Sequence, residues 1–358
     1  MWIASTLETV KTPTVIALGN FDGVHRGHQS VIAPVVATAR TLRETIKPPV
    51  EPVLAGVAAE TAGEATGEAA GETTGETANG AGQAFLWATV VMFHPHPRAF
   101  FSGQSRPLLT PLQEKARLLA QMGIEQMVVI PFDQALASLS PVEFVEQILV
   151  GHLQAQQISV GQDFRFGRKR QGTIADLQEI TAQYHIPVQV APLYLQQGER
   201  ISSSAIRQFL AQGEIDQANQ LLGRAYGLTG LVVTGKQLGR TIGFPTANLE
   251  LPPDKFLPRL GVYSVWVEIQ ADPNPLSPSA QANLLQPAVM NIGRRPTVAG
   301  ERVTVEVHLL DWSGDLYGQT LTVQLHQFLR PEQKFSSLDA LKQQIQQDCD
   351  RARATLSA

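Results

Sequence analysis

The periodicity of the apolar residues changes near residue 223, and this change constrains the fold more than any other feature of the chain. Before it, short apolar runs such as "TVIALGNF" (14–21), "FLWATVVMF" (85–93) and "QMVVIPF" (126–132) alternate with segments of helical spacing. Such alternation is typical of a parallel sheet covered by helices. After it, β-rich runs separated by Gly, Pro and Asn turns are typical of an all-β barrel or sandwich. The sequence therefore predicts two domains of different class, which suits its 358 residues.

The expected domain boundaries follow these patterns. Residues 1–200 form an α/β domain, residues 201–222 two closing helices that act as a linker, and residues 223–358 a β domain with a terminal helix. Within the first domain, residues 51–84 repeat Gly-Glu every four residues and contain no Lys, Arg or aromatic residue. Such a segment cannot bury enough apolar surface to offset the entropy lost on ordering. We therefore expect a flexible acidic insertion at 51–84.

The composition excludes several classes of function. The formal net charge is −4, so the chain lacks the overall basic field that would hold nucleic acid non-specifically. No apolar run approaches the length of a membrane span. The N-terminus has no basic region followed by a hydrophobic one, so we see no secretory signal and expect a cytoplasmic protein. The single cysteine, Cys349, permits no intrachain disulfide and is interpreted as a packed or idle thiol.

The string "GNFDGVHRGHQ" (19–29) follows the first apolar run and predicts an anion site. Its glycines allow backbone shapes that other residues resist, and Gly27 begins a helix whose N-terminal amides favour an anion. His25 and His28 are three apart, so both can face one site and stabilise charge on a phosphate. Two other interpretations stay open from these residues alone. One is a turn with two solvated histidines, and the other is a metal site, for which no third ligand has convincing spacing.

The string "TGKQLGRTIGFPTANLEL" (234–251) predicts a second phosphate site in the β domain. Three glycines four apart stand beside Lys236 and Arg240, which suits a flap whose amides approach phosphates, although the ending of a Walker loop is missing. Thr246 and Asn248 project to the same side of an extended segment, where their oxygens could ligate Mg²⁺. The alternative is a glycine-rich hairpin without a ligand.

The alternation in "VTVEVHLLDW" (303–312) assigns its residues to two faces of a strand. The valines point one way, whereas Thr304, Glu306 and His308 point the other. Glu306 could then act as a general base in the mouth of a barrel. A solvated strand face is the alternative.

Ordered sets of strings in both halves carry a family resemblance that covers nearly the whole chain except residues 51–84. In the first half they are "GNFDGVHRGHQ", "FHPHP" (93–97), "VGQDFRFGRKRQG" (160–172) and "ISSSAIR" (201–207). In the second half they are "GRTIGFPTAN" (239–248), "GVY" (261–263), "NIGRRPT" (291–297), "VEVHLLD" (305–311), "LYG" (316–318) and "FLRPEQKF" (328–335). This chain resembles the bacterial bifunctional riboflavin kinase/FAD synthetases.

For the first half, the resemblance implies a Rossmann-like α/β nucleotidyltransferase of the HxGH superfamily, which converts FMN and ATP to FAD and diphosphate. The acceptor phosphate attacks the α-phosphate directly in that superfamily, so no residue acts as a covalent nucleophile. The implied catalytic residues are His25 and His28. The implied ATP-binding residues are Gly19, Asn20, Phe21, Asp22, His25, His28, Ser203, Ser204 and Arg207. The implied flavin-binding residues are Phe93, Asp163, Phe164 and Phe166.

The motif "ISSSAIR" departs slightly from the family, which more often has "ISST" at this place. The hydroxyl is retained in Ser204, so we expect little loss of function. By resemblance, Ser203, Ser204 and Arg207 would hold the leaving β- and γ-phosphates. Hydroxyls and a guanidinium at a helix N-terminus suit that role.

For the second half, the resemblance implies a small Greek-key β-barrel with a C-terminal helix, which converts riboflavin and ATP to FMN and ADP. Glu306 would be the catalytic base that takes the proton from the ribityl 5′-hydroxyl. The implied phosphate-loop residues are Gly235, Lys236, Gly239, Arg240, Gly243, Thr246 and Asn248, of which Thr246 and Asn248 would also bind the metal. Arg330 and Phe335 would contact the flavin. Both reactions would need Mg²⁺.

Three rival functions remain to be weighed against a bifunctional enzyme. One half could be degenerate, but both sets of motifs look complete. A flavin-binding or flavin-delivery protein would need the aromatic residues but not Glu306, Thr246 or the paired histidines. A scaffold organised by residues 51–84 is conceivable only as an added role. The expected ligands are therefore riboflavin, FMN and ATP.

Overall fold

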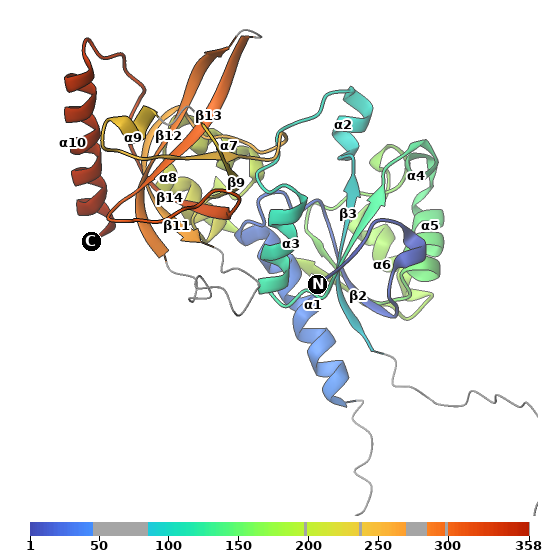
Figure 1. Ribbon diagram of the computed structural model, residues 1–358. Helices are drawn as coiled ribbons and strands as arrows, with labels where there is room; N and C mark the ends of the chain where they lie inside the picture. The colour runs from blue at the N-terminus through green and yellow to red at the C-terminus, as the bar shows by residue number, and fades with distance from the viewer. Residues whose placement is uncertain (46–84, 197–198, 236–237, 270–284, 298–299, 358) are drawn as a thin grey trace, which may run out of the picture.

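The computed structural model describes residues 1–45, 85–196, 199–235, 238–269, 285–297 and 300–357. They form an α/β body and a β-barrel that lie side by side (Figure 1). The insertion expected at 51–84 lies outside the described residues. None of the helices in the described part of the chain is long and apolar enough to cross a membrane.

Six parallel strands form the sheet of the α/β body, in the order β1-β4-β3-β2-β5-β6. Their bounds are β1 Trp2–Ala4, β2 Thr14–Leu18, β3 Trp87–His94, β4 Gln126–Pro131, β5 Ala155–Gly161 and β6 Val188–Ala191. The central strand β2 is buried along its whole length. Its alternating side chains enter two cores, with Val15 and Ala17 on one face and Ile16 and Leu18 on the other. The α/β sheet predicted from the sequence is confirmed, although the short edge strand β1 was not predicted.

Helices cover both faces of this sheet. Helices α1 (Arg26–Thr45) and α3 (Leu112–Gln121) share a core with Val15 and Ala17, whereas a π-helix (Phe144–His152) and α6 (Ile174–Ala182) pack on the opposite face. The helical spacing of residues 141–150 also predicts a helix here, and one is present, but most of it has π geometry. The remaining elements are α2 Pro97–Ser102, α4 Gln134–Ser138, α5 Pro141–Glu143, 3₁₀ turns at Leu7–Thr9 and Arg168–Arg170, and a hairpin of β7 Leu195–Gln196 and β8 Glu199–Arg200.

The β domain is a closed antiparallel barrel in the order β10-β13-β12-β11-β14-β9. The bounds are β9 Gly227–Val233, β10 Ala247–Glu250, β11 Gly261–Ile269, β12 Leu285–Thr297, β13 Gly300–Leu309 and β14 Thr320–Arg330. Strands β11, β12 and β13 follow one another, and β10 lies beside β13, which is the order of a Greek key. The predicted Greek-key barrel is confirmed.

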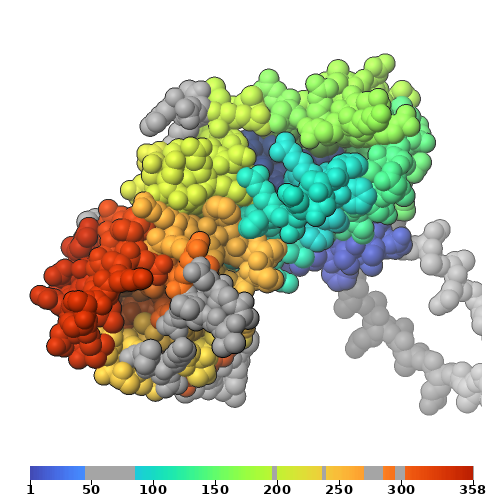
Figure 2. All heavy atoms as spheres, turned by 90° about the horizontal axis from the view of Figure 1, so that it is seen from above, coloured from blue at the N-terminus to red at the C-terminus, as the bar shows by residue number. Residues whose placement is uncertain are grey.

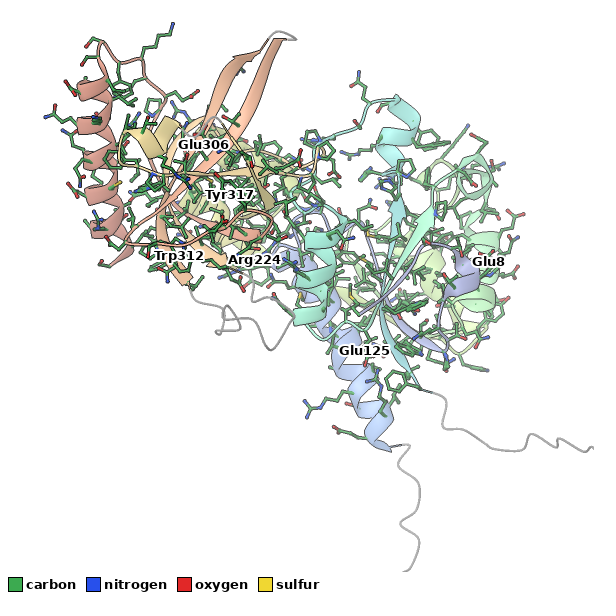
Figure 3. The ribbon with its side chains drawn as sticks, viewed as in Figure 1. Glu8, Glu125, Arg224, Glu306, Trp312 and Tyr317 are labelled. Carbon is green, nitrogen blue, oxygen red and sulfur yellow. The ribbon has the colours of Figure 1, made fainter. Side chains whose placement is uncertain are left out.

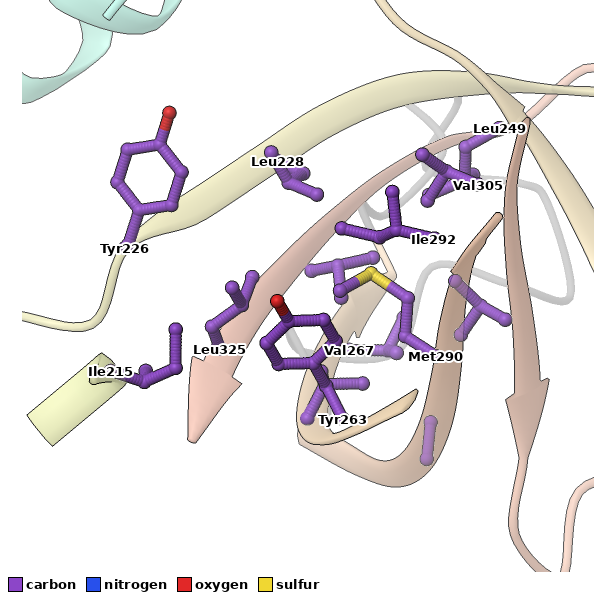
Figure 4. Packing of buried hydrophobic residues seen from close by; sticks show 14 of the residues in the cluster. Ile215, Tyr226, Leu228, Leu249, Tyr263, Val267, Met290, Ile292, Val305 and Leu325 are labelled. Carbon is purple, nitrogen blue, oxygen red and sulfur yellow. The ribbon is translucent and has the colours of Figure 1, made fainter. Parts of the chain in front are cut away.

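The barrel interior is filled by the inward residues of its strands, among them Tyr263, Met290 and Val305 (Figure 4). Helix α10 (Leu338–Leu356) covers part of the outer wall and buries Cys349 and Ala352 against it. Burial raises the pKa of the Cys349 thiol to about 11, which agrees with a packed, unreactive cysteine. The short helix α9 (Leu238–Thr241) lies between β9 and β10 in the chain.

Helices α7 (Ser203–Gln212) and α8 (Ile215–Leu222) connect the two bodies, and their apolar faces belong to the core of the barrel. In Figure 2 these yellow-green helices lie between the α/β body and the orange and red barrel. A second junction joins Lys255 to α3 and the segment before it, since its Nζ donates to the Leu109 carbonyl at 2.8 Å and pairs with Glu114 of α3. The two bodies are therefore packed together through buried polar contacts.

Candidate functional site

The chain passes from strand β2 to helix α1 through a tight turn, residues 20–24, which we call the β2–α1 turn. Phe21, Gly23 and Val24 have positive φ angles there, 47°, 91° and 41°. Such angles strain residues other than glycine, so the surroundings must hold the turn in place. Gly23 also has no room for a side chain, because a Cβ would lie 2.9 Å from Leu109. The contacts around the turn therefore fix its backbone conformation.

His25 and His28 stack directly after this turn. Their ring centroids are 3.6 Å apart with an interplanar angle of 16°, and the edge of Phe21 lies against His28. Burial lowers the pKa of His25 to about 4 and that of His28 well below its usual value. Both rings are therefore neutral at pH 7 before a ligand binds, and they offer N–H donors rather than a full positive charge.

The buried pair predicts a pH dependence of stability. The unfolded histidines protonate near pH 6.5, whereas folded His25 protonates only near pH 4, so stability is complete above pH 6.5 and falls toward pH 4. For His25 alone we expect a loss of about 2 kcal/mol at pH 5 relative to pH 7.5. Measured by urea unfolding at pH 7.5 and pH 5, the loss of unfolding free energy should be smaller in His25→Asn than in the wild type. Equal losses in the two proteins would contradict the pKa assignment.

Helix α7 brings the distant "ISSSAIR" motif onto the β2–α1 turn. Ser203 Oγ donates to the Asp22 carbonyl at 2.8 Å, and Arg207 pairs with the Asp22 carboxylate. Both charged side chains are largely buried, at 10% and 12% exposed. Ser204 is exposed at the first turn of the helix. The two segments implied by the resemblance thus meet in space, and the Asp22–Arg207 pair is an addition that sequence reasoning missed.

Unpartnered buried atoms gather at this place. In the described part of the chain, four buried side-chain polar atoms lack a hydrogen-bond partner, and three of them are Asn20 Oδ1, His28 Nδ1 and Arg207 Nε. Buried polar groups are normally paired, so a cluster of unpaired ones points to groups supplied by a ligand. In Figure 2, blue atoms of the N-terminal segment lie at the floor of a hollow between the cyan and yellow-green segments. The turn, α1 and α7 together form the first candidate site.

Lys115 is a further site residue that the sequence did not reveal. It is only 2% exposed on helix α3, and its Nζ donates to the Asn20 carbonyl at 2.8 Å. Burial lowers the pKa of this ammonium to about 8, so it remains mostly charged at pH 7. A lysine among the apolar residues of a helix is an ordinary sequence feature, and only the fold places it beside the turn.

The four residues implied at the flavin lie in different surroundings. Phe93 and Phe164 are partly exposed, whereas Phe166 is 5% exposed and belongs to the core on the π-helix side. The Phe164 and Phe166 rings stack with centroids 5.8 Å apart. Asp163 is exposed and pairs with Arg200. Their contact with a flavin stays a prediction.

A second candidate site lies on the outer wall of the barrel. The register places Asn248 of β10 opposite Glu306 of β13, and Glu306 opposite Asn291 of β12. Val305 and Val307 fill the interior at 3% and 0% exposed, so Glu306, which Figure 3 labels, lies on the opposite face of β13. The predicted division of this strand into two faces is confirmed, with the valines inside, whereas the role of Glu306 as a base in the barrel mouth stays a prediction. The three polar residues form a row across neighbouring strands.

Two glycines of the glycine-rich segment lie close to Asn248 and Thr246. A Cβ at Gly235 would collide with the Asn248 amide, and one at Gly239 would collide with the Phe244 carbonyl and lie 3.4 Å from Thr246 Oγ1. Glycine therefore lets the backbone reach both Thr246 and Asn248. Lys236 lies outside the described residues. Of the other phosphate-loop residues, Arg240 is exposed and Gly243 has a φ of 92°.

The oxygen atoms of this second site suit a hard cation. Thr246 supplies a hydroxyl, Asn248 an amide oxygen and Glu306 a carboxylate, whose Oε1 accepts a long hydrogen bond from Thr304 at 3.4 Å. Within the described ranges no three His, Cys, Asp or Glu residues cluster as metal ligands. A metal here would have few protein ligands and would be completed by phosphate and water oxygens, as is common for Mg²⁺.

Arg330 and Phe335 lie near helix α10. The Arg330 guanidinium pairs with Asp348 through contacts of 2.9 and 2.7 Å, and Asp348 is 2% exposed. The Phe335 ring lies 5.8 Å from the same guanidinium. Arg330 thus fastens β14 to α10, and its contact with a flavin stays a prediction. Sequence reasoning missed Asp348, since an acidic residue in an amphipathic helix is usually solvated.

Comparisons with known proteins show the family of the chain. Residues 222–356 match the family model of riboflavin kinase, and residues 7–47 and 76–205 match that of FAD synthetase. The bifunctional riboflavin kinase/FMN adenylyltransferase of Pseudomonas fluorescens is 38% identical over 341 residues, which cover 95% of this chain and 92% of the relative. That of Escherichia coli (strain K12) is 37% identical over 335 residues, or 93% and 90%. The crystal structure of a macrolide-efflux protein from Streptococcus pneumoniae superposes with a TM-score of 0.73 and 26% identity over 98% of both chains.

Proposed function

The chain belongs to the family of bifunctional riboflavin kinase/FMN adenylyltransferases, and from this premise we propose how its two sites divide the two reactions. The enzyme phosphorylates riboflavin to FMN and adenylylates FMN to FAD, with ATP as the co-substrate of both steps. We assign the adenylyl transfer to the β2–α1 turn and the phosphorylation to the outer wall of the barrel. The observation that carries the first assignment is the meeting of Asp22 with Ser203 and Arg207 beside unpartnered buried atoms.

In adenylyl transfer, an oxygen of the FMN phosphate attacks the α-phosphorus of ATP and diphosphate leaves. No covalent nucleophile is needed, so the protein contributes position and charge stabilisation. His25 and His28 stand at the start of α1, where the amides and the helix dipole also favour an anion. Their neutral rings donate N–H groups to the α-phosphate, and the bound anion raises their pKa, which strengthens these bonds in the transition state.

The remaining residues of the first site surround that reaction. Ser204 and the first amides of α7 bind the leaving diphosphate. Ser203 and Arg207, which the resemblance implies at the same phosphates, contact Asp22 and fix the helix start there. The rest of the implied set line the site: Gly19, Asn20 and Phe21 at the ATP, and Phe93, Asp163, Phe164 and Phe166 toward the flavin. Aromatic rings supply stacking area for an isoalloxazine.

In phosphorylation, the riboflavin 5′-hydroxyl attacks the γ-phosphorus of ATP, its proton passes to a base, and ADP leaves. Glu306 is the acceptor of that proton. Asn248, its cross-strand neighbour, and Thr246 would hold Mg²⁺, since both offer oxygen atoms beneath the glycine-rich flap. When bound, Mg²⁺ neutralises charge on the phosphate oxygens. The flap residues Gly235, Lys236, Gly239, Arg240 and Gly243 approach the phosphates, and Arg330 and Phe335 face the flavin.

The domain boundaries follow from this division. We propose that residues 1–200 form the adenylyltransferase domain, residues 201–222 the linker helices, and residues 223–358 the kinase domain. We propose a cytoplasmic location, where ATP is available for both reactions. No nucleic-acid or membrane partner enters either reaction.

A product time course tests the proposal and its metal. With riboflavin and Mg-ATP, FMN should appear first and FAD after it by chromatography. Excess EDTA should stop both steps, and added Mg²⁺ should restore them, because the phosphate charge is no longer neutralised without the metal. FMN formation at an unchanged rate in EDTA would contradict the metal assignment. The absence of FMN under all conditions would favour a flavin carrier instead.

A further inference from the structure

We propose that Arg224, at the start of the barrel, is a positioning residue for adenylyl transfer, which it serves by holding the β2–α1 turn from the kinase side. This proposal rests on the assignment of adenylyl transfer to that turn. Arg224 lies after α8 at the junction of the two bodies (Figure 3). The kinase domain thereby completes the support of the other domain's active site.

The contacts of Arg224 are specific. Its Nη2 donates to the Gly23 carbonyl at 2.7 Å and its Nη1 to the Val24 carbonyl at 3.1 Å. The guanidinium thus spans two successive peptide groups of the turn, which a planar fork can do and an ammonium cannot do equally well. Its pKa is lowered by burial only to about 10, so it stays charged at pH 7. Hydrogen bonds from a charged donor are the stronger kind.

The rest of the turn is held in the same manner from other elements. The side-chain donors are Lys115 to the Asn20 carbonyl, Ser203 to the Asp22 carbonyl, Gln29 to the Val24 carbonyl, and Arg224 to the carbonyls of both Gly23 and Val24. Among these donors, Arg224 holds two carbonyls of the turn itself and comes from the barrel side of the junction, whereas Gln29 joins the Val24 carbonyl to that of Leu222. A hydrogen bond to a carbonyl fixes the plane of that peptide group. The fixed plane in turn restricts the backbone angles of the next residue, and so the direction of that residue's side chain.

The strain of the turn explains why such support matters. Val24 has a φ of 41° and immediately precedes His25, so relaxation of Val24 toward an ordinary angle would rotate the first histidine. The stack of His25 on His28 would then be lost or displaced. A displacement of about 1 Å at a reacting group can cost roughly 100-fold in rate. Arg224 therefore acts on the reaction through the histidines and does not need to touch the substrate.

The test compares Arg224→Gln and Arg224→Lys with the full-length wild type. For Arg224→Gln we expect kcat of FMN adenylylation to fall by about 10- to 100-fold, because two charge-assisted hydrogen bonds are lost. The KM for FMN should change little, and riboflavin phosphorylation should stay close to wild type. Arg224→Lys keeps the charge but cannot span both carbonyls, so its kcat should also fall, by a smaller factor.

Arg259→Gln is the matched control. This arginine also donates to a carbonyl at the junction, that of Gln212 at 3.2 Å, but within the described residues it makes no hydrogen bond to the turn. Both activities should be unchanged in this variant. If Arg224→Gln does not fold, Arg224→Lys decides the matter alone.

Three results would overturn the proposal. Unchanged adenylylation in both Arg224 variants would remove the role, and full activity in Arg224→Lys would show that charge alone suffices. Parallel loss of both activities with a lower unfolding midpoint would show general destabilisation. Failure of the site assignment itself would be seen separately, as retained adenylylation in a His28 variant. If a His28 variant loses adenylylation while Arg224→Gln keeps it, the site assignment stands and only the positioning role of Arg224 is contradicted.

Discussion

Glu306→Gln is expected to lower the rate of riboflavin phosphorylation by about 10²- to 10⁴-fold, the usual contribution of a general base. Glutamine keeps the shape and the place in the strand register beside Asn248 and Asn291, but it cannot accept the proton of the 5′-hydroxyl. The measurement is FMN formation from riboflavin and Mg-ATP. With FMN supplied instead of riboflavin, the same protein should form FAD at close to the wild-type rate.

Glu268→Gln is a suitable control for this variant. Glu268 lies near the end of β11, on a strand that is not part of the Asn248–Glu306–Asn291 row. We expect both activities to remain at wild-type levels. Equal loss of phosphorylation and adenylylation in Glu306→Gln would contradict the division of the chemistry between the two sites. If Glu306→Gln phosphorylates riboflavin at close to the wild-type rate, a group other than Glu306 must act as the base.

His28→Asn is expected to lower FMN adenylylation by about 10²- to 10³-fold, the usual cost of removing one preorganised donor. The ring stacks on His25, and asparagine has neither the ring nor an atom at the place of Nε2, so the variant removes the stacked imidazole from the candidate site. Phosphorylation should continue. The product of a riboflavin reaction should therefore change from FAD to accumulated FMN.

His152→Asn controls for the removal of an imidazole. His152 ends the π-helix, is exposed, and takes no part in the site. The His152→Asn variant should form FAD at the wild-type rate. If His28→Asn instead forms FAD normally, the β2–α1 turn is not the place of adenylyl transfer. The metal requirement, the pH dependence of stability and the Arg224 variants are tested independently of this result.

The sequence predicted most of the architecture because the relevant signals are local. Alternating apolar runs and helical segments indicated a parallel sheet, and the β-rich second half indicated a barrel, as observed. The three residues of β1 are too few to show a period, so this strand was missed. The spacing over 141–150 predicted a helix, but apolar spacing alone did not distinguish π from α geometry.

The sequence predicted which residues belong to each candidate site, but not how these residues are arranged in space. Alternation separated Glu306 from Val305 and Val307, as observed, but it did not show which residues would lie beside Glu306. Two faces of one strand can be read from its own residues. The face that becomes a site depends on which other strands lie beside it, and here Asn248 and Asn291 arrive from distant parts of the chain.

The sequence by itself determined the two fold classes, the order of the domains and the candidate residues for the chemistry, because these depend on local periodicity and on motifs. Only the tertiary structure decided the support of those residues. Lys115, Arg224 and the Asp22–Arg207 pair are ordinary charges in their own segments. They become parts of an active site because folding buries them against a strained turn, where an unpaired charge or carbonyl would be costly.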